Sequence, residues 1–216
     1  MKNTNNVTEL VFILDRSGSM SGFESDTIGG FNSILEKQKK AEGKCFVTTV
    51  LFDDKYELLH DRLDIGDVKP LTEDDYTVRG CTALLDAVGR SIRHIAKIHH
   101  YARPEDVPEK TLFVITTDGY ENASRHFDAD EVRRMVGHEK EKYGWEFIFL
   151  GADIDAVETA RRIGIDRSRA ANYRKDTVGS ETMFASVDAA ITMARSCPTI
   201  SDSWKAEVDK DFKERK

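Results

Sequence analysis

The sequence predicts an α/β fold, doubly wound around a mostly parallel central sheet, with one antiparallel edge strand and helices on both faces. Three observations support this prediction. Continuous apolar runs recur along the chain, such as residues 11–14 and 112–115, and they are typical of strands buried on both faces of a parallel sheet. Helical patterns separate most of these runs, as parallel strands require. Two runs joined by a short turn predict an antiparallel hairpin at one edge of the sheet.

The first half of the chain supplies one strand, one helix and the hairpin. Residues 9–14 form the first strand, and residues 25–41 form a helix whose apolar side chains recur on one side. The pair Gly29-Gly30 would cost this helix on the order of 1 kcal/mol per glycine, and close packing of the helix on the sheet would explain it. Residues 45–52 and 56–60 form the two strands of the hairpin around an Asp-Asp-Lys turn.

The second half of the chain alternates helices and strands. Apolar side chains recur at spacings of three and four residues after Thr82, which predicts a long helix there. Asp153 is the expected N-cap of a shorter helix that Gly164 ends. We expect strands over residues 112–115 and 145–150, and helices over residues 82–99, 130–143, 154–163 and 180–195.

A chain of 216 residues is long enough for one large domain and short for two. We expect a polar lead over residues 1–7, the domain over residues 8–195, and a charged tail or helix over residues 196–216. No apolar run approaches the roughly 20 residues that span a bilayer, and the polar N-terminus lacks the apolar core of a signal peptide. The predicted location is therefore cytoplasmic, with no membrane partner.

Charge and cysteine content limit the partners that we expect. The formal net charge is −7, which argues against nucleic acid as the main partner because that affinity depends on clustered Lys and Arg. Cys45, Cys81 and Cys197 are widely spaced, odd in number and form no CxxC pair. They predict free thiols in a reducing compartment, in place of a disulfide framework or a zinc site.

Five oxygen-bearing side chains are expected to meet at the carboxyl ends of the strands. Asp15, Ser17 and Ser19 directly follow the first strand. Thr82 opens the long helix, and Asp118 follows a later buried strand. Open α/β sheets place ligand sites at this edge, and the three loops converge there if those two strands are neighbours. Carboxylates and hydroxyls are hard oxygen donors, so we predict a divalent cation, Mg²⁺ first, with Mn²⁺ or Ca²⁺ as alternatives.

Simpler interpretations exist for each loop. The first loop could be only a helix cap, Thr82 could be a plain N-cap, and Asp118-Gly119 could be a plain turn. Asp86 lies one helical turn beyond Thr82, so it could face the site as a further acceptor or be a solvated surface carboxylate.

The arrangement resembles the von Willebrand factor A domain, a Rossmann-like fold that carries a metal-ion-dependent adhesion site. The resemblance rests on Asp-x-Ser-x-Ser after the first strand, a later Thr in a loop and a later Asp-Gly after a strand, and it spans residues 8–195. It implies a metal bound by Asp15, Ser17, Ser19, Thr82 and Asp118. It also implies a protein partner whose Asp or Glu carboxylate completes the coordination. Without a signal peptide, the chain is similar to stand-alone cytoplasmic members of prokaryotic type, which suggests an intracellular adaptor or stress-related protein.

The rival hypothesis is a Mg²⁺-dependent phosphohydrolase or phosphotransfer enzyme, because such sites also open with a strand that ends in Asp. A haloacid-dehalogenase-like enzyme would need a second Asp two residues after the first, where this chain has Ser17. The sequence also lacks the Gly-x-x-x-x-Gly-Lys loop that binds nucleotide phosphates. We therefore expect a binding module with no catalytic residues.

Overall fold

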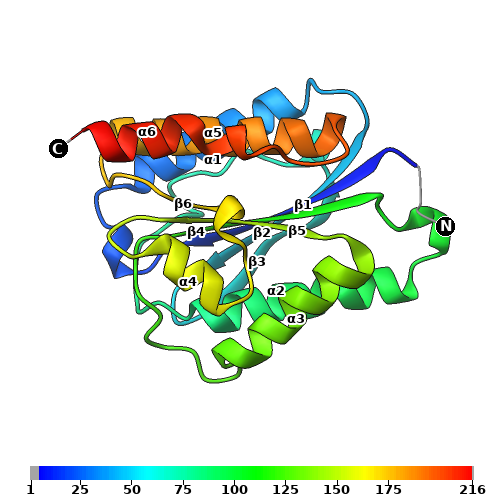
Figure 1. The fold of residues 1–216 in the computed structure, drawn as a ribbon, viewed down its shortest axis with the longest axis horizontal. Helices are drawn as coiled ribbons and strands as arrows, with labels where there is room; N and C mark the ends of the chain where they lie inside the picture. The colour runs from blue at the N-terminus through cyan, green and yellow to red at the C-terminus, as the bar shows by residue number, and fades with distance from the viewer. Residues whose placement is uncertain (1–4, 216) are drawn as a thin grey trace.

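Six strands form one sheet in the computed structural model, which describes residues 5–215 (Figure 1). Their order across the sheet is β3-β2-β1-β4-β5-β6, and every neighbouring pair is parallel except β2 and β3. The strands are β1 (Val7–Asp15), β2 (Lys44–Phe52), β3 (Tyr56–Asp64), β4 (Lys110–Thr117), β5 (Glu146–Gly151) and β6 (Ala170–Asn172). The predicted fold class is confirmed, including the antiparallel edge strand.

Helices cover both faces of the sheet (Figure 1). On one face lie α1 (Glu24–Gln38), α5 (Thr177–Ser196) and α6 (Ala206–Glu214). On the other lie α2 (Leu84–Tyr101), α3 (Ala129–Tyr143) and α4 (Ala156–Arg162). Each layer of helices buries its own apolar cluster against the sheet. None of the helices described between residues 5 and 215 is long and apolar enough to cross a membrane.

The strand β1 lies between β2 and β4, and its side chains point alternately into the two cores. Leu10, Phe12 and Leu14 belong to the cluster that contains α1 and α5 residues. Val11 and Ile13 belong to the cluster that contains α2 and α3 residues. Alternation between two buried faces explains why this run is apolar at every position. The strand therefore ends inside the molecule, with Asp15 at the carboxyl edge of the sheet.

The structure differs from the sequence prediction at the β6 edge of the sheet. Residues 170–172 form a short strand that pairs with β5, where the pattern predicts only a polar connection. Its residues, Ala-Ala-Asn, carry no β-branched or aromatic signal. The N-cap of α4 is Asp155, whose side chain accepts from Glu158 N, so the prediction that Asp153 caps this helix is wrong. Asp153 instead adopts a left-handed backbone with φ +52.

Gly30 marks a close approach between two helices. A Cβ at Gly30 would lie 2.0 Å from the ring of Phe184 on α5, whereas a Cβ at Gly29 would meet nothing within 4 Å. The close packing expected for this glycine pair therefore involves α5 and not the sheet. The helix predicted over residues 25–41 also ends earlier, at Gln38.

The C-terminal segment packs on the layer that contains α5. Trp204 and Val208 are buried in the same apolar cluster as Leu10 of β1, and the Trp204 indole donates to the Ser168 carbonyl oxygen at 2.9 Å. The charged end of the chain thus forms a helix with one buried face. Of the predicted polar lead, residues 1–4 lie outside the described part of the chain, and β1 begins at Val7.

Candidate metal site

The three predicted loops meet at the carboxyl edge of the sheet. The strands β1 and β4 are parallel neighbours with Leu14 opposite Thr116, so the residues that follow them lie at adjacent strand ends. The loop before α2 is tied to the loop after β1 by two backbone hydrogen bonds, from Gly18 N to the Gly80 oxygen at 3.1 Å and from Arg79 N to the Arg16 oxygen at 2.9 Å. All three loops therefore surround the point just beyond the end of β1.

A continuous chain of hydrogen bonds joins four of the five predicted ligands. Thr82 Oγ1 donates to Ser17 Oγ at 3.0 Å. Ser17 Oγ lies 2.9 Å from Ser19 Oγ, and Ser19 Oγ donates to Asp118 Oδ1 at 2.5 Å. Ser19 is half-buried and the other three residues are buried. The fold thus gathers four oxygen donors from three loops into one contiguous group.

Asp15, the fifth predicted ligand, is fully buried and receives only neutral hydrogen bonds. Its Oδ1 accepts from Ser17 N at 2.7 Å, and its Oδ2 accepts from the Thr117 hydroxyl at 2.5 Å. The pKa of Asp15 is raised to about 6, mainly by burial and also by the nearby Asp118 carboxylate, although the hydrogen bonds from Thr117 and Ser17 lower it. Two carboxylates buried close together favour the binding of a cation.

The donor set fits a hard divalent cation. Asp118 Oδ2 is buried and makes no hydrogen bond within residues 5–215; its close partner is the Lys175 ammonium, 2.8 Å away. Three hydroxyls and two carboxylates offer only oxygen, the ligand that Mg²⁺ and Ca²⁺ prefer. Over the same described residues, no cluster of three or more His, Cys, Asp or Glu side chains could hold a metal. The candidate site is therefore this mixed group of hydroxyls and carboxylates.

Helix capping does not account for these contacts. The N-cap of α2 is Ala83 and not Thr82, and the Thr82 hydroxyl donates to Ser17. Ser17 precedes a short 3-10 turn over residues 18–20, but its side chain makes no capping hydrogen bond. The hydroxyl groups of the loop are directed toward one another and toward Asp118.

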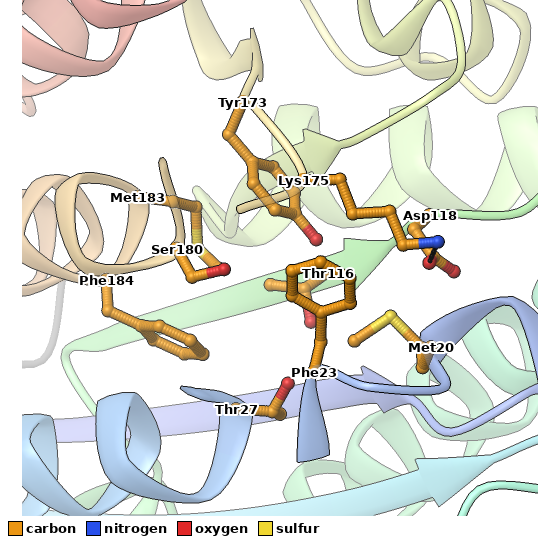
Figure 2. A pocket seen from close by; sticks show the side chains of 10 residues that line it. All are labelled: Met20, Phe23, Thr27, Thr116, Asp118, Tyr173, Lys175, Ser180, Met183 and Phe184. Carbon is orange, nitrogen blue, oxygen red and sulfur yellow. Dashed lines mark ion pairs between the residues drawn. The ribbon is translucent and has the colours of Figure 1, made fainter. Parts of the chain in front are cut away.

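Lys175 is a residue of the site that the sequence does not predict. It lies in the loop between β6 and α5, and its Nζ is 2.8 Å from Asp118 Oδ2, outside hydrogen-bond geometry. The same Nζ donates to the backbone oxygen of Ser19 at 2.6 Å. Figure 2 shows the side chain extended toward Asp118. No sequence signal marks Lys175, because it follows a strand that the apolar pattern does not predict.

A buried ion cluster next to the site holds the adjoining loops together. Arg16 and Asp53 are both buried, and Arg16 Nε donates to Asp53 Oδ2 at 3.2 Å. Arg79 Nε donates to the same oxygen at 2.8 Å. Burial alone would raise the pKa of Asp53, but the hydrogen bond from Arg79 and the charges of both arginines lower it overall. The turn of the β2–β3 hairpin therefore anchors the loop that leads to Thr82.

Asp86 organises the loop that follows Asp118. Its carboxylate is buried and accepts from the backbone N–H groups of Arg125, His126 and Phe127 at distances between 2.9 and 3.1 Å. The alternative that Asp86 is a solvated surface carboxylate is therefore wrong. Both of its oxygens are used to hold this loop beside α2.

Solved structures that are similar in fold include von Willebrand factor A domains. Proximal thread matrix protein 1 from the mussel byssus, with zinc in its MIDAS motif, is 15% identical, and the match covers 87% of this chain and 46% of that chain with a TM-score of 0.59. The vWF domain of the type V pili tip protein Mfa5 from Porphyromonas gingivalis is 11% identical over 90% of this chain and 98% of that chain, with a TM-score of 0.61. The ArnB paralog VWA2 from Sulfolobus acidocaldarius is 16% identical over 87% and 46% of the two chains, with a TM-score of 0.53.

Identities this low show the fold alone. The chain spans about half the length of the mussel protein that it matches. No family profile matches the sequence, and no curated protein is similar to it in sequence. The fold is that of a von Willebrand factor A domain, and the nature of the site rests on its own residues.

Proposed function

We propose that this chain is a divalent-metal-dependent protein-binding module whose site is of the metal-ion-dependent adhesion type. The observation that supports it most directly is the hydrogen-bonded chain of hydroxyl oxygens from Thr82 through Ser17 and Ser19 that ends at the buried carboxylate of Asp118. The mussel protein of the same fold holds zinc at its MIDAS motif. An Asp or Glu carboxylate of a protein partner would complete the coordination.

The five side chains divide between neutral and charged ligands. Ser17, Ser19 and Thr82 would supply hydroxyl oxygens, and Asp15 and Asp118 would supply the negative charge. Two carboxylates just balance a divalent ion and leave it with few anionic ligands. A bound metal would supply the positive centre that attracts a further carboxylate. Mg²⁺ is the ion that we expect, with Mn²⁺ and Ca²⁺ as alternatives.

The rim of the site has the character of a protein-binding surface. Tyr120, next to Gly119, is 64% exposed, and Cys81 and Asn122 are also exposed. Exposed aromatic side chains are enriched at protein interfaces. This supports a protein as the partner, and the net charge of −7 gives no support to nucleic acid.

We also propose that the chain is not an enzyme. Hydrolysis would need a general base or an activated nucleophile beside the metal. Within residues 5–215, no histidine or cysteine side chain makes a hydrogen bond to any of the five predicted ligands. Metal-dependent hydrolysis of a phosphate ester that is lost in Asp15→Asn would contradict this part of the proposal.

A cytoplasmic role as an adaptor or stress-related protein, away from membranes, stays a prediction. It is supported by the cysteines, which are free thiols in the structure. Two of them, Cys81 and Cys197, are exposed, and exposed free thiols are typical of reducing compartments.

The test combines metal binding with partner capture. Calorimetric titration with Mg²⁺ or Mn²⁺ should show one site in the full chain and none in Asp15→Ala. Immobilised protein should capture partners that are released by EDTA and that are missing when Asp15→Ala is used. A matched control is Asp74→Asn, which neutralises an exposed carboxylate of a surface loop and should behave as the wild type. Partners that stay bound to Asp15→Ala in excess EDTA would overturn the proposal.

A further inference from the structure

Lys175 brings a positive charge of the chain itself to the candidate metal site. We propose that its ammonium group is a tethered competitor of the metal: it neutralises Asp118 when no metal is bound, and it must leave Asp118 before a divalent ion can bind. Lys175 would thereby set the metal affinity of the module. This inference rests on the proposed metal site and assigns a regulatory role to a residue outside the predicted ligand set.

The ammonium group contacts two of the three loops that form the site. Its Nζ lies 2.8 Å from Asp118 Oδ2 and donates to the backbone oxygen of Ser19 at 2.6 Å. The same Nζ lies 5.4 Å from the centre of the Phe23 ring, within cation–π range. The side chain is only 22% exposed. Lys175 is therefore held in a defined position, unlike a solvated surface lysine.

The ammonium and a metal require the same carboxylate oxygen. Asp118 Oδ2 receives no hydrogen bond within the described residues, and the ammonium is the charge that faces it. A Mg²⁺ ion on this carboxylate would lie about 2 Å from the oxygen, within a few ångström of Nζ. Two positive charges that close together repel strongly in a buried site, where water screens them little. The two cations therefore exclude each other.

The ammonium cannot move inward to make room for a metal. A cavity of about 10 Å³ lies beside Lys175, and Met20, Phe23 and Tyr173 are among the side chains that line it (Figure 2). That volume holds about one water molecule. Most of the surrounding side chains are apolar or aromatic, so they offer poor solvation for a charge. We therefore expect the ammonium to move toward the rim.

Asp153 gives the ammonium a second position at that rim. Its Oδ2 lies 3.7 Å from Lys175 Nζ, and its side chain is 65% exposed. Asp153 has φ +52, a left-handed conformation that L-residues rarely adopt, in the loop after β5. A small rotation of the lysine side chain would carry its charge from Asp118 to Asp153 without the loss of an ionic partner. The two carboxylates thus define a closed and an open position of Lys175.

The decisive experiment compares Mn²⁺ affinities by calorimetry in the full chain. Lys175→Met removes the charge and keeps the length of the side chain, so we expect it to bind Mn²⁺ about tenfold more tightly than the wild type. Lys175→Gln is a second neutral variant that keeps a donor for the Ser19 oxygen, in case the Met variant folds poorly. Lys175→Arg keeps the charge and should gain no affinity. Lys69→Met, at an exposed lysine, is the matched control and should leave the affinity unchanged.

The role of Asp153 is tested by a double-mutant cycle. Asp153→Asn removes the open position, so it should weaken Mn²⁺ binding about threefold in the wild type. The same substitution should have no effect in Lys175→Met, because no ammonium then needs a new partner. An equal effect of Asp153→Asn in both backgrounds would overturn the assignment of Asp153.

Chemical labelling follows the lysine directly. Limited acetylation of the wild type should modify Lys175 at least threefold faster when Mn²⁺ is saturating, because the ammonium has left Asp118, whereas Lys69 should react at one rate in both states. Equal rates at Lys175 would contradict the proposal. Equal affinities of the wild type and both neutral variants would overturn the competition and leave the metal site intact. Absence of Mn²⁺ binding in every variant would overturn both the competition and the proposed function.

Discussion

The strand β1 carries a fully buried carboxylate at each end, Glu9 and Asp15, and the two differ in the groups that face them. Glu9 Oε1 lies 3.0 Å from Arg62 Nε, and Glu9 Oε2 lies 2.5 Å from His99 Nε2. Asp15 receives one backbone N–H and one hydroxyl, and the nearby Asp118 has the same charge as Asp15. The amino end of the strand is thus electrostatically complete, and the carboxyl end is not.

This difference separates a carboxylate that stabilises the fold from one that is suited to a ligand. Burial of a charge is costly unless an opposite charge and hydrogen bonds compensate for it. At the amino end the chain supplies an arginine and a histidine for one carboxylate. At the carboxyl end, the ammonium of Lys175 lies 2.8 Å from Asp118, whereas Asp15 receives a backbone N–H and a hydroxyl and has the like charge of Asp118 nearby. The degree of burial is the same in both places, so the groups that face each carboxylate are the informative observation.

Metal binding should distinguish the two ends of β1 most strongly. Asp15→Asn should lower the affinity for Mg²⁺ or Mn²⁺ at least 1000-fold, about 4 kcal/mol, because it removes half of the negative charge of the site. Glu9→Gln should leave the affinity within about threefold of the wild type, because Glu9 lies at the opposite end of the strand. Calorimetric titration of both variants measures this. A comparable loss in both would show that metal binding only reports the stability of the sheet.

Without metal, the free energy of unfolding should respond in the opposite order, with the larger loss in Glu9→Gln and not in Asp15→Asn. Glu9→Gln should lower it by about 3 kcal/mol, because the Arg62 guanidinium would remain partly buried without its partner. For a chain of this length that corresponds to a fall in Tm of roughly 6–12 °C. Urea unfolding in EDTA measures the difference. Stability within about 0.5 kcal/mol of the wild type would mean that the Glu9 cluster does not support the fold.

Asp15→Asn should stabilise the metal-free protein by about 1–2 kcal/mol at pH 7. The pKa of Asp15 is raised from 3.8 to about 6, chiefly by burial, so its ionised form destabilises the folded state above that pH. This cost should shrink as the pH falls through 6, where the folded protein takes up the proton before the unfolded chain does. Urea unfolding in EDTA at pH 7 and pH 5 should therefore show a smaller gain at pH 5. A loss of stability at pH 7 would mean that the charge of Asp15 is compensated.

The smallest expected effect on metal affinity comes from steric crowding at the carboxyl end of β1. A Cβ on Gly119 would lie 2.6 Å from Thr82 Oγ1 and 3.0 Å from Ser19 Oγ. Gly119→Ala should therefore lower the metal affinity about tenfold, or roughly 1.4 kcal/mol, by displacing two ligand oxygens with no change of charge. Gly137→Ala is the matched control in α3, because its Cβ would meet nothing within 4 Å. It should keep the metal affinity and stabilise the helix by up to about 1 kcal/mol. Unchanged affinity in Gly119→Ala would place the metal away from these hydroxyls.

Much of the fold can be predicted because a strand buried on both faces has no solvent-facing side and is therefore apolar over most of its length. That requirement makes β1, β2, β4 and β5 visible as apolar runs. It fails for β6, because a strand of only three small residues, Ala-Ala-Asn, is too short to form an apolar run. The predicted N-cap of α4 is also wrong. Asp153 and Asp155 are equally suitable capping residues by type, and only the backbone conformation shows that Asp155 is the one that caps the helix.

The candidate site likewise contains residues that the sequence predicts and residues that it does not. The grouping of the five proposed oxygen ligands can be predicted because their residue types are informative and because adjacent strand ends bring their loops together. Lys175 and Asp53 cannot, because their importance lies in the charges that they face after folding. A lysine in a polar loop and an aspartate in a hairpin turn are ordinarily solvated. Only the distances to Asp118 and to Arg16 show that these two residues are not.

The site is assembled from positions that are far apart in the chain: Ser19 and Asp118, which share a hydrogen bond, are 99 residues apart. The two loops are brought together by the pairing of β1 and β4, so the ligand set depends on long-range contacts of the folded sheet. This contrasts with zinc fingers, in which closely spaced ligands hold the metal and the chain unfolds without it. We therefore expect a chelator to remove the proposed ion and to leave this protein folded, so that the ion would bind reversibly to a structure that is already formed.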